Sequence, residues 1–394
     1  MLLPVHAGLA LGPLVMEEPV RDARSHWETM VRLCQTWQGR SHEDVMNGTS
    51  LAPNLSDDER TLAVLTLKKM RGIARKTAVR ILLSIGGQVH THSDLKESVR
   101  VCKETPRSLR DLDHEEFERE WSDAEAHARR TIDWADKRGV GILVSGGEGF
   151  PRTIGSIDDP PVLLYVRGVR DLLDRTDSVA IIGTREPSVR GRRAAKDTAD
   201  LFATKGWVVV SGLAVGCDSI AHLSCVELTG GQTVAVLANP LEKSKVYPAE
   251  NRDLAQRILD RGGAWVSENG PFDTITKGSF VERDRLQSGF ASAVVLIESS
   301  VSGGSMHASR ACLAQGSGRL LAVISYGSKP GDSEQVNDSG NLFFLQETPR
   351  HPAVRELKNR SNLEDLLTEL DRQRVSPRSE VRQGRLSIDT PFGQ

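Results

Sequence analysis

Four short segments of the sequence combine glycine or small residues with hydroxyl or basic side chains, which is the chemistry of a site for a phosphate-bearing ligand. In the first, Gly183 lets a ligand approach the backbone, Thr184 can donate its hydroxyl, and Arg185 can form a two-point pair with a phosphate. Further bases follow in the next expected helix: Arg190, Arg192, Arg193 and Lys196. Such bases are also typical of a solvated helix face, and both interpretations stay open.

The second segment, residues 211–218, lies between an apolar run and a helical stretch. Its candidate residues for close phosphate approach are Ser211, Gly212 and Ala214. Asp218 is expected to be the N-cap of the following helix. His222 in that helix has the chemistry of a general base, but no nucleophile is positioned as its partner, so a structural role is favoured.

The third segment, residues 277–285, adds an aromatic ring to basic charge. Its candidate residues are Lys277, Phe280, Arg283 and Arg285. Phe280 can stack on a base while the cations hold the backbone, which is how proteins hold single strands without sequence preference. The alternative is a salt-bridged helix cap with Phe280 in the core.

The fourth segment, residues 302–307, places tandem glycine and serine at an expected helix start, where backbone N–H groups attract anions. Its candidate residues are Gly303, Gly304 and Ser305. The segment lacks the lysine of a P-loop and the spacing of a dinucleotide-binding motif, so nucleotide hydrolysis is not supported. Glu298, the acid after the preceding apolar run, has no second carboxylate at a catalytic spacing.

The elements that must position these segments follow from an alternation of short apolar runs and helical stretches from residue 178 onward. The predicted strands contain VAIIG, WVVVSG, TVAVLA, AWVSE, AVVLIES and LLAVIS. The predicted helices are Val189–Lys205, Asp218–Leu228, Asn251–Asp260, Glu282–Phe290 and Met306–Ala314. Strands that are apolar on both faces belong to covered parallel sheets. We expect an α/β, Rossmann-like parallel sheet covered by helices on both faces, with the four segments at its carboxyl edge.

A helical N-terminal domain is expected before this sheet. Residues 67–78 predict two helices joined at Gly72, which resembles a helix-hairpin-helix that can hold a phosphate; an ordinary helical hairpin is the alternative. Two strands, at 139–144 and 162–166, are predicted in the connection, and a helix, Val354–Leu370, in the tail. The predicted domains are 1–134, helical; 135–175, connecting strands; 176–347, Rossmann-like; and 348–394, tail helix and disordered C-terminus.

Composition limits the classes of function. The 394 residues carry a formal net charge of −2, so a nucleic-acid site must be a local basic cluster. The five cysteines are scattered, without metal-ligand spacing, which favours a reducing cytoplasm and predicts no metal site. No apolar run is long enough for a membrane span, and no export signal is recognisable, so no membrane partner is expected.

Several motifs together resemble the DNA-processing protein A (DprA/Smf) family over about residues 150–345. They are GTREPS from Gly183, VVSGLAVGCDSIAH from Val209, GGQTVAVLA from Gly230, YPAEN from Tyr247, SFVERDRLQSG from Ser279 and VLIESSVSGGSMHASRACLAQG from Val295. The resemblance implies a Rossmann-like fold, single-stranded DNA binding at a basic pocket, a homodimer, and loading of the recombinase RecA during natural transformation (competence). It implies neither catalysis nor a cofactor. The residues that it marks as lining the site are Gly183, Thr184, Arg185, Ser211, Gly212, Ala214, Phe280, Arg283, Arg285, Gly303, Gly304 and Ser305; Lys277 is added for its charge.

Two departures from the family pattern affect this transfer. The usual Arg-Asn-Arg is here Arg283-Asp284-Arg285, which inserts an acid between two bases and can weaken phosphate binding or redirect the site. The usual Gly-Ile-Asp is Gly216-Cys217-Asp218, a small change at a position expected to be buried.

Three alternative functions stay open. The same DNA site can serve repair or phage defence instead of transformation. A Rossmann-like sensor or enzyme for a nucleotide-derived ligand would need a positioned acid near the phosphate loops, and Asp284 and Glu298 are the residues to inspect. An adaptor role would rest on the N-terminal helices and the tail helix binding a partner protein.

Overall fold

The computed structural model describes residues 51–155, 157, 159–314, 318–327, 336–347 and 351–375. The expected helical structure before residue 51 and the expected disorder after residue 375 lie outside the described residues. No helix within the described ranges is long and apolar enough to cross a membrane.

The first described region is helical, as its Arg-, Glu-, Leu- and Ala-rich composition predicts. It contains α3 (Asp57–Lys69), α4 (Arg75–Ile85), α5 (His92–Val101), α6 (Arg107–Arg110) and α7 (His114–Asp136). Helix α3 begins where Ser56 and Glu59 form a reciprocal capping box, which satisfies two N–H groups that a helix start leaves unpaired. Helices α3 and α4 are joined at Gly72, whose φ of +77° suits glycine, so the predicted hairpin is present.

A nine-stranded sheet follows, with the order β1-β2-β6-β5-β4-β3-β7-β8-β9. Its strands are β1 (Gly141–Val144), β2 (Leu163–Gly168), β3 (Ser178–Ile182), β4 (Val208–Ser211), β5 (Gln232–Val236), β6 (Ala264–Ser267), β7 (Ala293–Leu296), β8 (Leu320–Ile324) and β9 (Val354–Leu357). Pairing is parallel from β6 through to β9, whereas β1 and β2 join antiparallel at one edge. The two connecting strands therefore belong to the same sheet as the Rossmann-like strands, while the predicted domain division itself stays a prediction.

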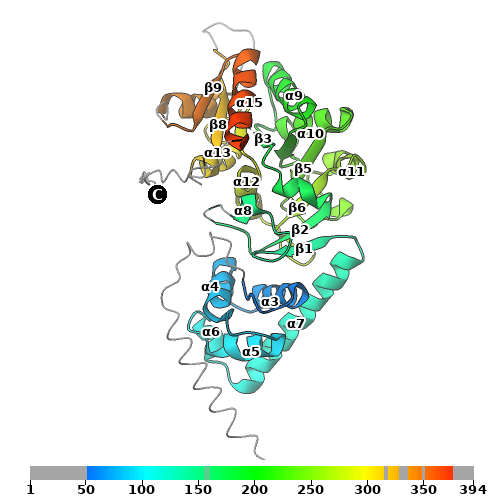
Figure 1. Ribbon diagram of the computed structural model, residues 1–394, viewed down its shortest axis with the longest axis vertical. Coiled ribbons are helices and arrows are strands. Elements are labelled where there is room, and N and C mark those ends of the chain that lie inside the picture. Colours follow the sequence, from blue (N-terminus) through cyan, green and yellow to red (C-terminus); the bar gives the residue numbers. More distant parts are fainter. Residues whose placement is uncertain are drawn as a thin grey trace, which may run out of the picture. The chain divides into compact units, whose positions relative to one another are not determined.

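The central strands are buried on both faces, as their continuous apolar runs predict. Along β3, Val179 and Ile181 pack into one hydrophobic cluster and Ala180 and Ile182 into another. The first cluster includes side chains of α9 (Val189–Thr204), α10 (Cys217–Glu227) and α15 (Arg360–Val375), and α11 (Arg252–Asp260) packs beside α10. The second includes side chains of α8 (Arg152–Gly155), α12 (Lys277–Gly289) and α13 (Ser305–Ala314). Helices thus cover both faces, which confirms the predicted fold class (Figure 1).

The remaining described elements are short. They are the 3-10 turns η1 (Arg170–Asp174), η2 (Lys243–Lys245) and η3 (Ala249–Asn251), the helix α14 (Ser339–Leu342) and the π-helical turn η4 (Phe343–Glu347). They connect the larger elements, and η2 and η3 lie in the loop that follows β5.

Two expected boundaries are wrong. Helix α12 begins at Lys277 rather than Glu282, because Thr276 and Ser279 form a capping box that starts the helix one turn and a half earlier. The third segment is therefore the helix itself and not a loop. The expected helix Val354–Leu370 is a strand, β9, followed by α15, because residues 354–357 pair with the exposed edge of β8.

Candidate nucleic-acid interface

The four segments meet at the carboxyl edge of the sheet, at the point where the chain changes direction across it. Strand β3 pairs with both β4 and β7, and the helices that follow β3 and β7 pack on opposite faces. An open parallel sheet has its ligand crevice at such a switch point. The topology therefore brings the loops after β3, β4 and β7 together beside α12.

The loop after β3 is held in place by Glu298. The Thr184 N–H donates to the Glu298 carbonyl at 2.6 Å, and the Ser188 N–H and hydroxyl donate to its Oε2 at 3.1 and 2.7 Å. Asn337 N–H donates to Oε1 at 3.1 Å, and a Cβ on Gly191 would overlap the carboxylate. Glu298 is 1% exposed, so its oxygens hold the start of α9 rather than face a ligand.

Below the loop after β4, the backbone amides are already occupied. Asp218 Oδ2 accepts from Gly212 N–H at 3.1 Å and from Ala214 N–H at 3.3 Å, and Ser211 donates its hydroxyl to Ile181 O at 2.6 Å. The expectation that Asp218 caps α10 is wrong: the N-cap is Gly216. Its φ is +85°, and a Cβ there would lie 2.5 Å from carbonyl oxygens of the β3–α9 loop, so only glycine fits.

Arg283 lies beneath the same loop. Its Nη1 donates to Val236 O at 3.2 Å, its Nε lies 3.4 Å from Asp284 Oδ1, and the residue is 8% exposed. A Cβ on Gly212 would overlap the guanidinium. Glycine at 212 therefore makes room for the arginine, which is almost fully covered beneath the loop.

Two buried carboxylates flank this arginine. Burial raises the pKa of Asp218 to about 6, although the positive charge of Arg283 opposes the rise. Burial likewise raises the pKa of Asp284 to about 6, opposed by Arg283, a hydrogen bond from Gln287 and the charge of Arg185. We call Ser211, Gly212, Asp218, Arg283 and Asp284 the floor of the site.

Arg285 is engaged elsewhere. Its Nη2 donates to both carboxylate oxygens of Glu268 at 2.8 Å, and its Nε lies 3.3 Å from Asp159 Oδ2. Arg75 at the start of α4 pairs with the same two acids. The geometry thus places Arg285 in an ion-pair network that joins α12 to the helical region; its predicted contact with a ligand stays a prediction.

Four side chains and one glycine stand above the floor in accessible positions. Arg185 and Lys277 are exposed, and no ion pair is found for either within the part of the chain that the structure describes. Phe280 is half-buried and contacts Tyr247 edge to face, with ring centroids 5.5 Å apart, and Tyr247 is 53% exposed. Gly304 is exposed, with open space where a Cβ would stand. We call Arg185, Tyr247, Lys277, Phe280 and Gly304 the rim.

Tyr247 was not among the residues predicted from the sequence. The sequence does indicate this position, because a tyrosine in the loop after β5 must lie at the same carboxyl edge of the sheet as the other segments. The alternative that Phe280 is a core residue is not what the structure shows, since the ring is only partly buried.

The neighbouring residues of the fourth segment hold the loop together. Gly303 N–H donates to Ser300 O at 2.9 Å, and Ser305 donates its hydroxyl to Ser299 Oγ at 2.7 Å. A Cβ on Gly303 would lie 2.5 Å from Ser299 Oγ. Gly304 is exposed and has open space where a Cβ would stand, and its carbonyl accepts from His307 N–H at 3.0 Å.

Two of the four bases on α9, Arg193 and Lys196, are paired within their own helix. Arg193 lies 3.6 Å from Asp197 and Lys196 lies 2.6 Å from Asp200, in the i,i+4 arrangement of a solvated face. Arg190 lies over the Tyr326 ring at 5.2 Å. His222 is fully buried beside Thr233 Oγ1 at 2.7 Å, and burial lowers its pKa to about 3, which fits the structural role expected for it.

The helical hairpin also has internal partners at its turn. Arg71 N–H donates to Glu120 Oε1 at 2.8 Å, and Arg75 pairs with Asp159 and Glu268. Carboxylates therefore occupy donors that a phosphate would use in a helix-hairpin-helix, and the hairpin's DNA role stays a prediction.

A family model and curated proteins match part of this chain. The family model described as DNA recombination-mediator protein A matches residues 141–350, which is more than half of the chain. The DNA processing protein DprA of Bacillus subtilis is 30% identical over 180 residues, which cover 46% of this chain and 59% of that protein. Protein Smf of Escherichia coli is 31% identical over 184 residues, covering 46% and 48%. The chain thus spans about half the length of the curated relatives it matches.

Among solved structures, DNA processing protein A of Streptococcus pneumoniae superposes with a TM-score of 0.60 at 22% identity. The match covers 77% of this chain and 97% of that one. This likeness supports the fold assigned above.

Proposed function

The chain belongs to the DNA recombination-mediator protein A family, and from this premise we propose that it binds single-stranded DNA across the rim. The observation that supports this most is the aromatic pair Tyr247 and Phe280 at the same edge as the exposed bases Arg185 and Lys277. Bases stack on aromatic rings while cations hold the phosphates. A duplex keeps its bases stacked on each other, so this arrangement favours single strands.

In this proposal the floor shapes the site and the rim contacts the strand. Arg283 donates to Val236 O at the end of β5, lies against Gly212 and is balanced by two carboxylates, so its charge adds little attraction for a phosphate. With a formal net charge of −2, the attraction must come from the local bases of the rim. No nucleophile or general base is assigned, and the proposed role is binding rather than catalysis.

The finer role follows from the family rather than from the site. We propose that the chain acts as a homodimer that promotes loading of a RecA-type recombinase on single strands. The test is recombinase filament assembly on oligonucleotide coated with single-strand-binding protein. Faster assembly in the presence of this chain, lost in the rim variant below, supports loading; equal assembly without it contradicts loading while leaving DNA binding intact.

The binding test uses fluorescence anisotropy of a labelled single-stranded oligonucleotide and a duplex of equal length at two salt concentrations. We expect tight binding to the single strand that weakens with salt. Arg185→Ala with Lys277→Ala should lower affinity about tenfold or more and reduce the salt slope by roughly 1.4, since each lost contact to a single strand contributes about 0.7.

The matched control removes the same charge from α9. Arg193→Ala with Lys196→Ala deletes two bases that already have intrahelical partners, so affinity should change less than about twofold. If both double variants lose affinity for single-stranded DNA equally, the rim bases act only through their general charge and not as specific contacts. No binding to single strands, or tighter binding of a mononucleotide, would replace the proposal with a site for a nucleotide-derived ligand.

A further inference from the structure

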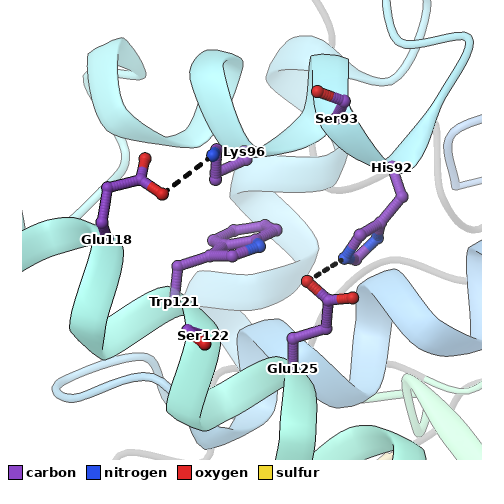
Figure 2. Close-up of a pocket in the computed structure, with 7 residues that line it drawn as sticks. All are labelled: His92, Ser93, Lys96, Glu118, Trp121, Ser122 and Glu125. Carbon is purple, nitrogen blue, oxygen red and sulfur yellow. Dashed lines mark hydrogen bonds and ion pairs between the residues drawn. The ribbon is translucent and has the colours of Figure 1, made fainter.

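A pocket of about 310 Å³ lies between α5 and α7 in the helical region (Figure 2). Its charged groups are paired with one another. Lys96 Nζ lies 3.0 Å from Glu118 Oε2, and His92 Nε2 lies 3.5 Å from Glu125 Oε2. These pairs balance the charges that line the pocket. The opposite side of α7 is different, because bases there lack such partners.

That side of α7 adjoins the loop that follows β6. An α-helix turns once in about 3.6 residues, so His127 and Arg130 lie on the side of α7 away from the pocket. His127 meets Phe272 edge to face, with ring centroids 5.1 Å apart and planes inclined at 64°. Lys69, at the end of α3, lines the same small hollow as these two rings. We call Lys69, His127, Arg130 and Phe272 the outer patch.

The loop around Phe272 holds its ring in an exposed position. The residue is 50% exposed, although burial of so large an apolar side chain would be favourable. Gly270 N–H donates to Asp273 Oδ2 at 2.8 Å, and the side-chain amide of Asn269 donates to Ala238 O at 2.8 Å. These hydrogen bonds fix the turn that carries the ring, which is therefore presented to solvent in a defined place.

Two bases of the outer patch stand beside its rings without an acid partner. Lys69 and Arg130 are exposed, and no ion pair is found for either among the residues that the structure describes. Burial lowers the pKa of His127, and the charges of Lys69 and Arg130 lower it further while Asp273 opposes them, so all three charges lie near the imidazole. Asp273 itself lies 4.0 Å from Lys68 Nζ. With that acid offset, Lys69 and Arg130 remain as positive charges next to two aromatic rings.

We propose that the outer patch binds a further stretch of the same single strand that occupies the rim; this inference rests on the DNA binding proposed above. Aromatic rings beside cations hold the bases and phosphates of single strands. The loop that carries Phe272 runs directly into α12, whose first residue is Lys277 of the rim. The five steps between these residues span at most about 18 Å of extended chain. An acidic protein would match the charge as well, but this short connection to the rim favours the strand.

The experiment compares two fluorescent oligothymidylates, of about 6 and about 20 nucleotides, because a single-strand-binding fold covers about 4–16 nucleotides. Anisotropy titrations use the full chain. Lys69→Ala with Arg130→Ala should weaken binding of the longer strand at least fivefold. The same variant should lower the salt slope of the longer strand by roughly 1.4, since each lost contact contributes about 0.7. Affinity for the shorter strand, which occupies the rim alone, should change less than twofold.

The matched control removes one lysine and one arginine elsewhere in the helical region. Lys103 and Arg110 are likewise exposed and have no ion pair in the described part of the chain. Lys103→Ala with Arg110→Ala should change either affinity less than twofold.

A second pair of variants tests the ring. Phe272→Ala should weaken binding of the longer strand at least fivefold at an unchanged melting temperature, because the side chain is exposed. Phe272→Trp keeps an aromatic ring and should retain the affinity of the parent protein.

The rim variant, Arg185→Ala with Lys277→Ala, separates this proposal from the proposed function, because it should weaken binding of both lengths. A longer strand bound equally well by the parent and by the Lys69→Ala, Arg130→Ala variant would overturn the outer-patch proposal and leave the patch to an acidic protein, while binding at the rim stands. Equal losses in the control variant would overturn it too. If the parent protein binds neither length, both proposals are wrong.

Discussion

The floor and the rim lie at one edge of the sheet, yet they use similar residue types in opposite ways. Arg283 in the floor is buried between two carboxylates and lies against Gly212, whereas Arg185 in the rim is exposed and has no ion pair within the described residues. Gly212 makes room for a side chain, whereas Gly304 borders open space. The comparison teaches that a residue in a binding motif can act by shaping the site or by contacting the ligand.

The largest effect on stability is expected for Arg283→Ala, which tests the difference between floor and rim. Removing the arginine leaves Asp218 and Asp284 buried without their cation. Removing one partner of a buried ion pair lowers the free energy of unfolding by about 3–5 kcal/mol. Arg185→Ala should change the unfolding free energy by less than about 0.5 kcal/mol. Urea unfolding of both variants checks the pair; equal stability would remove the distinction between floor and rim.

Next in size is Gly212→Ala. The added Cβ would overlap the Arg283 guanidinium, and overpacking of this kind costs about 1–3 kcal/mol. Gly304→Ala adds the same methyl group in open space, and its melting temperature should match that of the parent protein. Both variants replace one glycine by alanine, so their melting temperatures show directly whether the two loop glycines differ in how much space surrounds them.

Removing the two aromatic rings of the rim should weaken DNA binding without changing the stability of the fold. Phe280→Ala with Tyr247→Ala removes the rings that meet at 5.5 Å, and loss of base stacking should cost about 1–3 kcal/mol in single-stranded DNA affinity per base. Duplex binding should change little. An unchanged single-strand affinity in anisotropy titrations would show that bases do not stack at the rim.

A smaller effect concerns pH. The pKa of Asp284 is raised to about 6 by burial, above the ordinary value of 3.8. Because the folded state holds this proton more tightly than the unfolded state, the protonated carboxyl adds to the free energy of unfolding. The contribution is complete below about pH 3.8 and is lost as the pH rises to about 6. Asp284→Asn should therefore flatten the fall in melting temperature between pH 4 and pH 6.5. At pH 7 the variant should bind single strands somewhat more tightly, since one buried negative charge is gone.

Much of the fold follows from local pattern, and less of the site does. Runs such as VAII predicted strands because apolar residues on both faces require a covered sheet. The start of α12 was missed because Thr276 and Ser279 cap it reciprocally, and β9 was missed because its pairing with β8 is not a local property.

The division into floor and rim could not be predicted from the sequence. It depends on contacts between residues far apart in the chain, such as Gly212 beneath which Arg283 fits, and Arg285 with the acids Glu268 and Asp159. A motif shows which residue types occur together but not which of them are covered. Tyr247 illustrates the converse, because its accessibility becomes evident only once the loop after β5 is placed.

The ion-pair network of Arg75, Asp159, Glu268 and Arg285 has a consequence for the energetics of α12. The helix carries Lys277 and Phe280 near its beginning. Further along it, Arg285 pairs with Asp159 and with Glu268, which directly follows β6, and both acids also pair with Arg75 of α4. A ligand therefore meets a helix whose orientation is set before it arrives, and little conformational entropy remains to be lost on association. Preorganisation of this kind favours slow dissociation of the ligand, because the protein gains little conformational entropy when the ligand is released.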